Sequence, residues 1–117
     1  TNFEPITQPL TQKDLKIIPY LVNGFKTHNE SSPITSSQIV SLCNSFFEQK
    51  GMDLRISEPK LRKCCNYIRS NGILPLIATS NGYFVSTDKE MIKSQIESLK
   101  QRANSMINCA AGLEKFL

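Results

Sequence analysis

The fold is decided by residues 57–87, which read SEPKLRKCCNYIRSNGILPLIATSNGYFVST. The first half opens on Ser57 and Pro59, a combination typical of the first turn of a helix. It stops at Asn71-Gly72, a typical helix end. Between these signals apolar residues recur at helical spacing, which predicts one buried face. That face holds Leu61, Cys64, Cys65 and Ile68.

The second half of the stretch predicts a β-hairpin. Leu74–Ala78 and Tyr83–Ser86 are short apolar runs of strand length, and Ser80-Asn81-Gly82 between them is a strong turn signal. A long last helix then starts near Thr87, where Thr87-Asp88-Lys89-Glu90 has the form of a capping box. The stretch therefore predicts a helix, a hairpin and a second helix in that order.

Two further helices precede this stretch. Thr11 followed by Asp14 resembles a capped helix start, and this helix is either kinked at Pro19 or begins near Ile18. Thr35-Ser36-Ser37-Gln38 is another capping box, and the helix that it opens ends near Gly51. Three helices, a hairpin and a last helix follow the order of a winged helix-turn-helix with a long C-terminal helix.

We therefore predict a mainly α-helical fold with a small β-hairpin. Residues 1–10 contain Pro5 and Pro9 and are expected to form an extended N-terminal arm. Residues 11–87 are expected to form the winged-helix domain, and residues 88–117 the C-terminal helix, a dimerisation element. A chain of 117 residues is long enough to form one small hydrophobic core.

The net charge of +4 is concentrated in one segment. The chain carries 14 Lys and Arg against 10 Asp and Glu. Residues 50–69 hold six of the basic and two of the acidic residues, so the rest of the chain is balanced. A local basic patch on a neutral domain is typical of a protein that binds the phosphate backbone. The alternative is a basic, solvated helix face.

The helix that follows Ser57 is expected to turn a polar face outward, opposite its apolar stripe. That face combines two kinds of side chain: cations, which bind phosphates, and polar groups, which hydrogen-bond to base edges. We expect it to enter the major groove of DNA, with support from the preceding loop and the hairpin turn. The predicted DNA-binding residues are Lys50, Arg55, Lys60, Arg62, Lys63, Asn66, Tyr67, Arg69, Ser80 and Asn81.

The sequence has no pattern typical of a metal or catalytic site. Its four cysteines form no Cys-x-x-Cys pair, and His28 is the only histidine. We expect free, buried thiols in a reducing cytoplasm, with disulfides as the alternative. No Gly-rich phosphate loop and no acidic pair at catalytic spacing is present, so we expect neither an enzyme nor a cofactor. No apolar run reaches the roughly 18 residues of a membrane span.

The last helix carries a regular apolar stripe. From Ile92 the apolar residues recur in alternating steps of four and three, which is typical of a two-stranded coil or a helical bundle. The residues expected at a dimer interface are Ile92, Ile96, Leu99, Ala103, Met106, Ala110 and Leu113. The alternative is that this helix folds back and packs on the first helix of the same chain.

The chain from about Ile17 onward resembles small winged-helix proteins encoded by phages and prophages. The resemblance lies in Pro33-Ile34-Thr35-Ser36, Ile56-Ser57-Glu58-Pro59-Lys60-Leu61-Arg62, Ile68-Arg69 before Gly72, Leu76-Ile77-Ala78-Thr79-Ser80-Asn81-Gly82-Tyr83 and Ser98-Leu99-Lys100-Gln101-Arg102-Ala103. It implies DNA binding in the control of phage transcription or replication, in the cytoplasm of the host cell.

Two hypotheses of function follow from the sequence. The first is a non-enzymatic, homodimeric protein that binds double-stranded DNA through the helix after Ser57. The second is a protein-interaction module that uses the same surface, such as an adaptor, an inhibitor of a host factor or a virion-associated component. Salt-dependent binding to duplex DNA distinguishes the first from the second.

Overall fold

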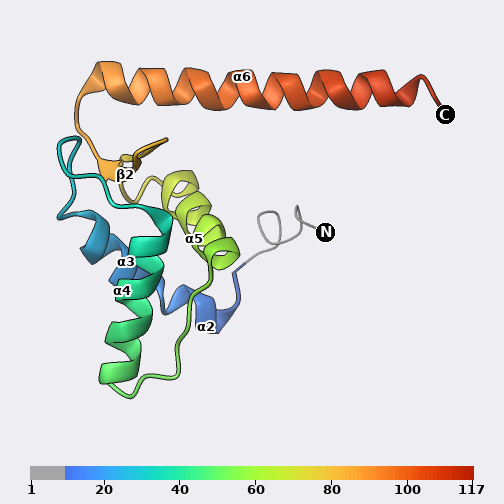
Figure 1. Cartoon of the computed structure of the whole chain (residues 1–117). Coiled ribbons are helices and arrows are strands. Elements are labelled where there is room, and N and C mark those ends of the chain that lie inside the picture. Colours follow the sequence, from blue (N-terminus) through green and yellow to red (C-terminus); the bar gives the residue numbers. More distant parts are fainter. Residues whose placement is uncertain (1–9) are drawn as a thin grey trace. The chain divides into compact units, whose positions relative to one another are not determined.

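The computed structural model describes residues 10–117, and the chain divides into two compact units, Thr1–Ser86 and Thr87–Leu117. The fold is mainly helical, with a small antiparallel hairpin and a long C-terminal helix (Figure 1). The elements are α2 (Gln12–Leu15), α3 (Ile18–Phe25), α4 (Ser36–Gln49), α5 (Glu58–Ser70), β1 (Leu76–Thr79), β2 (Gly82–Val85) and α6 (Lys89–Glu114). The expected arm lies almost wholly outside the described residues.

The helix starts follow the expected caps, with one exception. Thr35 caps α4 through a reciprocal box with Gln38, and the Ser57 hydroxyl accepts a hydrogen bond from the Lys60 N–H at the start of α5. At α6 the prediction was wrong by one residue, since Asp88 rather than Thr87 caps the helix. The Asp88 carboxylate accepts from the Glu90 N–H at 3.0 Å, and an acidic cap also favours the positive end of the helix dipole.

The first predicted helix is two separate helices. Thr11 and Asp14 form a capping box on the short α2, and α3 begins at Ile18 with Pro19 in its first turn. Of the two alternatives at Pro19, the later start is therefore the observed one. Proline is tolerated there because a first-turn residue needs no N–H for the helical hydrogen bonds.

The hairpin is joined to the segment just before α4. β1 pairs antiparallel with β2, with Ile77 opposite Phe84. Ile34 and Tyr83 also exchange two backbone hydrogen bonds, at 2.9 and 2.8 Å, in an isolated antiparallel bridge. No pairing of Ile34 was predicted from the sequence. The bridge fixes the hairpin to the helical part of the unit.

Gly82 makes this bridge possible. Its φ is +127°, a conformation that residues with a side chain rarely adopt. A Cβ at this position would lie 2.5 Å from the carbonyl oxygen of Ile34, which is the oxygen that accepts from the Tyr83 N–H. The turn therefore needs glycine both for its backbone conformation and for the close approach of Ile34.

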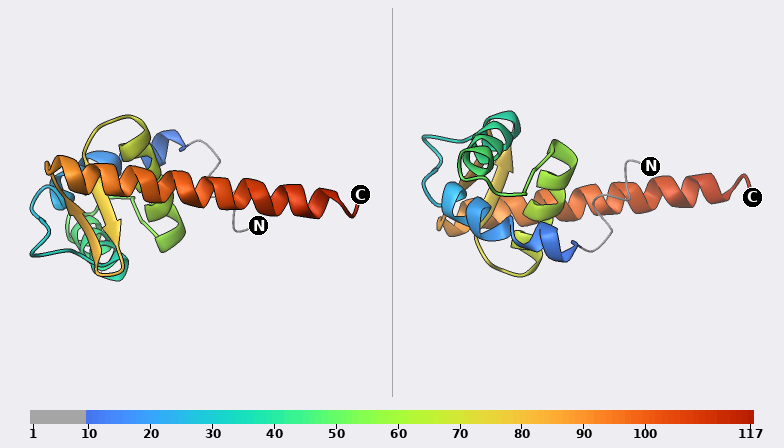
Figure 2. Two further views of the ribbon diagram at one scale, coloured as in Figure 1. Left: turned by 90° about the horizontal axis from the view of Figure 1, so that it is seen from above. Right: turned by 90° about the horizontal axis from the view of Figure 1, so that it is seen from below.

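α3, α4, α5 and the hairpin together enclose one hydrophobic core. Figure 2 shows these elements of the first unit from two further sides. The α5 stripe is buried as expected, and it meets residues from α3 and α4 such as Leu21, Phe25 and Phe47. Tyr83 from β2 lies against the Phe25 ring, with 5.5 Å between the ring centroids. The core thus holds the inner face of α5 and leaves its opposite face to solvent.

We expect Gly82→Ala to destabilise the first unit by at least about 3 kcal/mol, since it combines backbone strain with a clash against Ile34. Gly72→Ala is the matched control, because Gly72 has φ +62° and open space around it. The free energy of unfolding of the control should fall by only about 1–2 kcal/mol, which is the cost of placing a residue with a side chain in the left-handed conformation. Urea unfolding followed by circular dichroism measures both, and equal losses would contradict the role given to the bridge.

Candidate nucleic-acid interface

The outward face of α5 is narrower than the sequence predicted. Arg62, Asn66 and Ser70 are exposed and follow one another along the helix, and Pro59 lies in the same line. Lys63, one of the predicted DNA-binding residues, is half-buried. The exposed line therefore combines one guanidinium, one amide and one hydroxyl, which suit phosphate oxygens and base edges.

Lys60 is engaged within the protein. Its ammonium lies 3.0 Å from the Asp14 carboxylate, and Asp14 is only 6% exposed. Desolvation by burial acts to raise the pKa of Asp14, but hydrogen bonds from Lys60 and Thr11 and the charge of Lys60 outweigh it, so the pKa is lowered. This ion pair fastens α2 to α5, and Lys60 acts mainly as a structural residue.

Two other predicted residues of α5 pack against neighbouring parts of the unit. Tyr67 is partly buried against the hydrophobic core. Arg69 is half-buried, and its Nε atom is buried without a hydrogen-bond partner among residues 10–117. The charges of Arg69 and Arg62 act on Tyr83, whose hydroxyl bonds to the Cys65 thiol.

The loop before α5 contributes further cations. Lys50 lies over the Phe46 ring, 5.9 Å from its centroid, and Arg55 is exposed. Asp53 pairs with Lys13 at 2.9 Å in an exposed contact. At the hairpin turn Ser80 and Asn81 are both exposed, and the Asn81 N–H donates to the Thr79 hydroxyl. The turn therefore offers polar groups at its tip.

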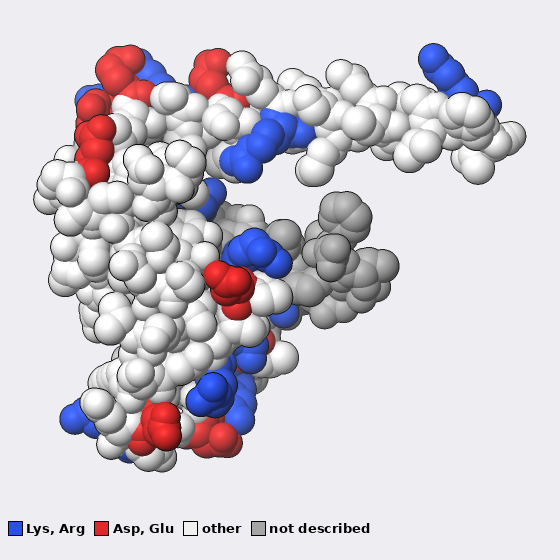
Figure 3. Space-filling view, in the orientation of Figure 1, with Lys and Arg blue, Asp and Glu red and all other residues white. Residues whose placement is uncertain are grey.

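The ion pairs leave the charge of this surface unchanged. Lys60 is neutralised by Asp14 and Asp53 by Lys13, and both outside partners precede the basic segment 50–69. Within the segment five basic residues then stand against Glu58, which again gives an excess of four positive charges. Acidic side chains lie among the basic ones on the face seen in Figure 3. The surface is basic in total but is not uniformly positive.

Hydrogen bonds between α4 and the start of α5 set the position of the exposed line, and the sequence did not reveal them. The Asn44 amide donates to the Ile56 carbonyl and accepts from the Ile56 N–H, both at 2.9 Å. The Ser36 hydroxyl donates to the Glu58 carboxylate at 2.8 Å. An asparagine in the middle of a helix is the one sequence signal for this role, because asparagine is unfavourable there unless its side chain finds a hydrogen-bond partner.

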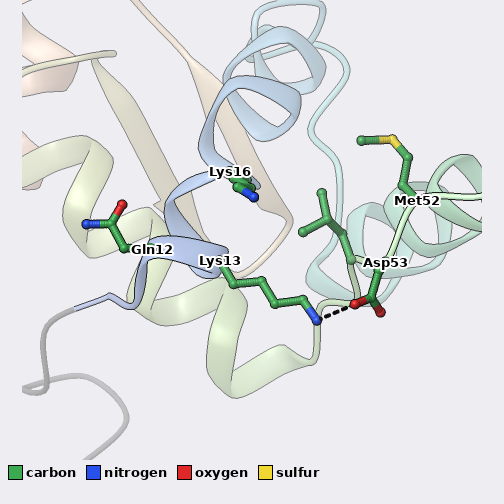
Figure 4. A pocket seen from close by; sticks show the side chains of 6 residues that line it. Gln12, Lys13, Lys16, Met52 and Asp53 are labelled. Carbon is green, nitrogen blue, oxygen red and sulfur yellow. Dashed lines mark hydrogen bonds and ion pairs between the residues drawn. The ribbon is translucent and has the colours of Figure 1, made fainter.

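Two depressions lie away from the exposed line of α5. One, of about 550 Å³, is lined by Gln12, Lys13, Lys16, Met52, Asp53 and Leu54 (Figure 4). The Lys13 ammonium points to the Asp53 carboxylate there, which leaves Lys16 as the unpaired cation among the lining residues. The other, of about 360 Å³, lies between α3 and α4 beside Leu42, which is 61% exposed.

The cysteines are free thiols in two environments. Cys43, Cys64 and Cys65 are buried, whereas Cys109 in α6 is exposed, so the expectation of burial was wrong for Cys109. Burial raises the pKa of Cys64 to about 12, with Cys65 and Asp14 adding to it, and raises the pKa of Cys65 to about 11. Among residues 10–117, no group of three or more His, Cys, Asp or Glu side chains could hold a metal ion.

No protein-family profile, curated protein or solved structure matches this chain. Within the part of the chain that the structure describes, no helix combines the length and the apolar character needed to cross a membrane.

We expect one thiol per chain to react rapidly in the native protein. Cys109 is accessible, whereas a thiol with a pKa near 11 or 12 has almost no reactive thiolate at pH 8. Titration with a disulfide reagent at pH 8 should quickly modify one thiol of the unaltered native protein and none of native Cys109→Ser. After unfolding, all four thiols of the unaltered protein should react. Rapid modification of two or more thiols in the native protein would contradict the burial of the other three.

We expect Asp14→Asn to destabilise the protein at pH 7 by about 1–3 kcal/mol, since it removes a charge-assisted bond to Lys60. The pKa of Asp14 is lower in the folded state than its ordinary value of about 3.9. The stabilisation is therefore complete above that value and is lost as the pH falls through the lower, folded pKa. Urea unfolding between pH 7 and pH 3 should show the two proteins converging at acid pH.

Asp53→Asn is the matched control for this experiment, because Asp53 forms an ion pair of similar length that is fully exposed. Exposed pairs contribute little to stability. A loss at pH 7 as large as that of Asp14→Asn would show that burial of the carboxylate is not what matters.

Proposed function

We propose that this protein is a winged-helix protein that binds double-stranded DNA, with α5 as the helix that enters the major groove. The observation that carries the proposal is the line of exposed residues on α5, Arg62, Asn66 and Ser70. This line begins within the segment that holds the whole excess of positive charge and ends directly after it. Arginine binds phosphates and guanine edges, and asparagine binds adenine edges, so the line can serve both affinity and sequence recognition.

The arrangement of elements supports this proposal. A winged helix consists of a helix, a short strand, two helices and a hairpin whose second strand pairs with the short one. The corresponding parts here are α3, Ile34, α4, α5 and the hairpin, with the bridge between Ile34 and Tyr83. The segment just before α5 is tied to α4 through Asn44 and Ile56, which gives the exposed line a rigid support.

The charges that remain after internal pairing are enough for a phosphate-binding surface. Arg55, Arg62 and Lys63 form no ion pair among the described residues, and they span the loop and the first turns of α5. Each phosphate contact releases counterions and adds about 0.9 to the slope of log K against log salt. Binding through these residues should therefore weaken steeply as salt is raised.

We expect the full chain to bind a random-sequence duplex at 50 mM salt and to lose affinity at 200 mM salt. Arg62→Ala/Lys63→Ala should weaken binding at 50 mM by about 10-fold or more and lower the salt slope by about 2. Fluorescence anisotropy measures both. Asn66→Ala should leave the slope unchanged, because an amide carries no charge, and should reduce discrimination between duplex sequences.

Lys16→Ala/Lys26→Ala is the matched control, since it removes the same charge from two exposed lysines outside the basic segment. It should change the affinity by less than about 3-fold. Equal losses in the two double variants would show that binding follows net charge and not the face of α5. No binding by the unaltered chain at 50 mM would favour the alternative, a module that binds a protein.

A further inference from the structure

The C-terminal helix α6 has no buried residue over its 26 residues. Its apolar stripe is instead open to solvent, and Met106, Ile107 and Leu113 are each more than 60% exposed. Residues 103–113 contain no charged side chain, and Figure 3 shows this part of the helix as a continuous uncharged surface. A helix with such a face is stable in water mainly when another surface covers it.

We propose that the partner of α6 is the α6 of a second copy of this chain, and that the two helices run antiparallel. The stripe has the seven-residue period of a two-stranded coil. In heptad notation the a positions are Ile96, Ala103 and Ala110, and the d positions are Leu99, Met106 and Leu113. Apart from Ile96, the small residues thus lie at a and the large residues at d.

The sizes of these residues favour the antiparallel orientation. In a parallel pair each residue meets its own copy, so two layers would hold only alanine. In an antiparallel pair each a residue meets a d residue. The layers of the antiparallel pair are Ile96 with Leu113, Leu99 with Ala110, and Ala103 with Met106, each occurring twice. Every alanine then meets a large side chain, which fills the seam evenly.

The flanking charges favour the same orientation. In the antiparallel pair Lys93 of each copy lies near Glu114 of the other, so opposite charges meet at both ends. Between residues 95 and 114 a parallel pair would bring no opposite charges together. Asp88 could approach Lys93 in a parallel pair, but its carboxylate already caps the helix. Size and charge therefore select one orientation.

The pairing is independent of DNA binding, so its test uses the full chain without DNA. Sedimentation equilibrium should show a monomer–dimer equilibrium. Met106→Glu places a charge in the central layers and should weaken the dimer by at least about 100-fold. Asn108→Glu adds the same charge on the outward side of the helix and should change the dissociation constant by less than about 3-fold. A monomer at all concentrations, a tetramer, or equal effects of the two variants would overturn the proposal.

Disulfide cross-linking tests the orientation. In a Cys109→Ser background, Leu99→Cys and Ala110→Cys lie in the same layer only in the antiparallel pair. Oxidation of a mixture of the two variants should give mainly the mixed dimer, and each variant alone should cross-link poorly. The three buried thiols should not interfere. Efficient cross-linking of Leu99→Cys to itself would show a parallel pair and overturn the assignment.

Discussion

The two hydrogen bonds between Ile34 and Tyr83 are the interaction on which the first unit depends. A two-stranded hairpin is only marginally stable in water, and β1 and β2 are four residues each. The bridge adds a third backbone segment to the hairpin and lays the Tyr83 ring against Phe25. Because Ile34 immediately precedes the cap of α4, the same bonds also fix where α4 begins. Helices and hairpin are thereby positioned relative to one another within this unit.

α5 has to satisfy two opposing demands within 13 residues. Its inner face supplies four fully buried residues to the core, and its outer face carries cations. Lys60 lies between the two and is matched by a carboxylate that is itself nearly buried. A buried ion pair stabilises a protein little more than two well-packed hydrophobic residues would, but loss of either partner leaves an uncompensated charge. Asp14 on α2 thus neutralises Lys60 at the boundary between the two faces.

Features set by neighbouring residues could be predicted from the sequence, and features set by distant residues could not. The caps at Thr35 and Ser57 depend on a few adjacent residues, and the structure has them where expected. The same holds for the hairpin turn, which falls at Ser80 and Asn81 within the predicted Ser80-Asn81-Gly82. The Asp14–Lys60 pair joins residues far apart in the chain. The helical wheel gives directions around α5 but not what packs beside it, so the half-burial of Tyr67 and Arg69 was not foreseen.

The proposed pairing of α6 sets how far apart the first units of the two copies lie. This distance bears on DNA recognition and rests on both the proposed pairing and the proposed DNA binding. With Ala103 opposite Met106, the two copies of Lys89, the first residue of each α6, lie about 46 Å apart along the paired helices at 1.5 Å per residue. Each first unit continues directly into its own α6 through Thr87 and Asp88. The first units of the two copies are therefore tethered at opposite ends of the pair, farther apart than the about 34–36 Å of one turn of DNA. A parallel pair would tether both units at one end, so the orientation of α6 decides how far apart two DNA half-sites can be.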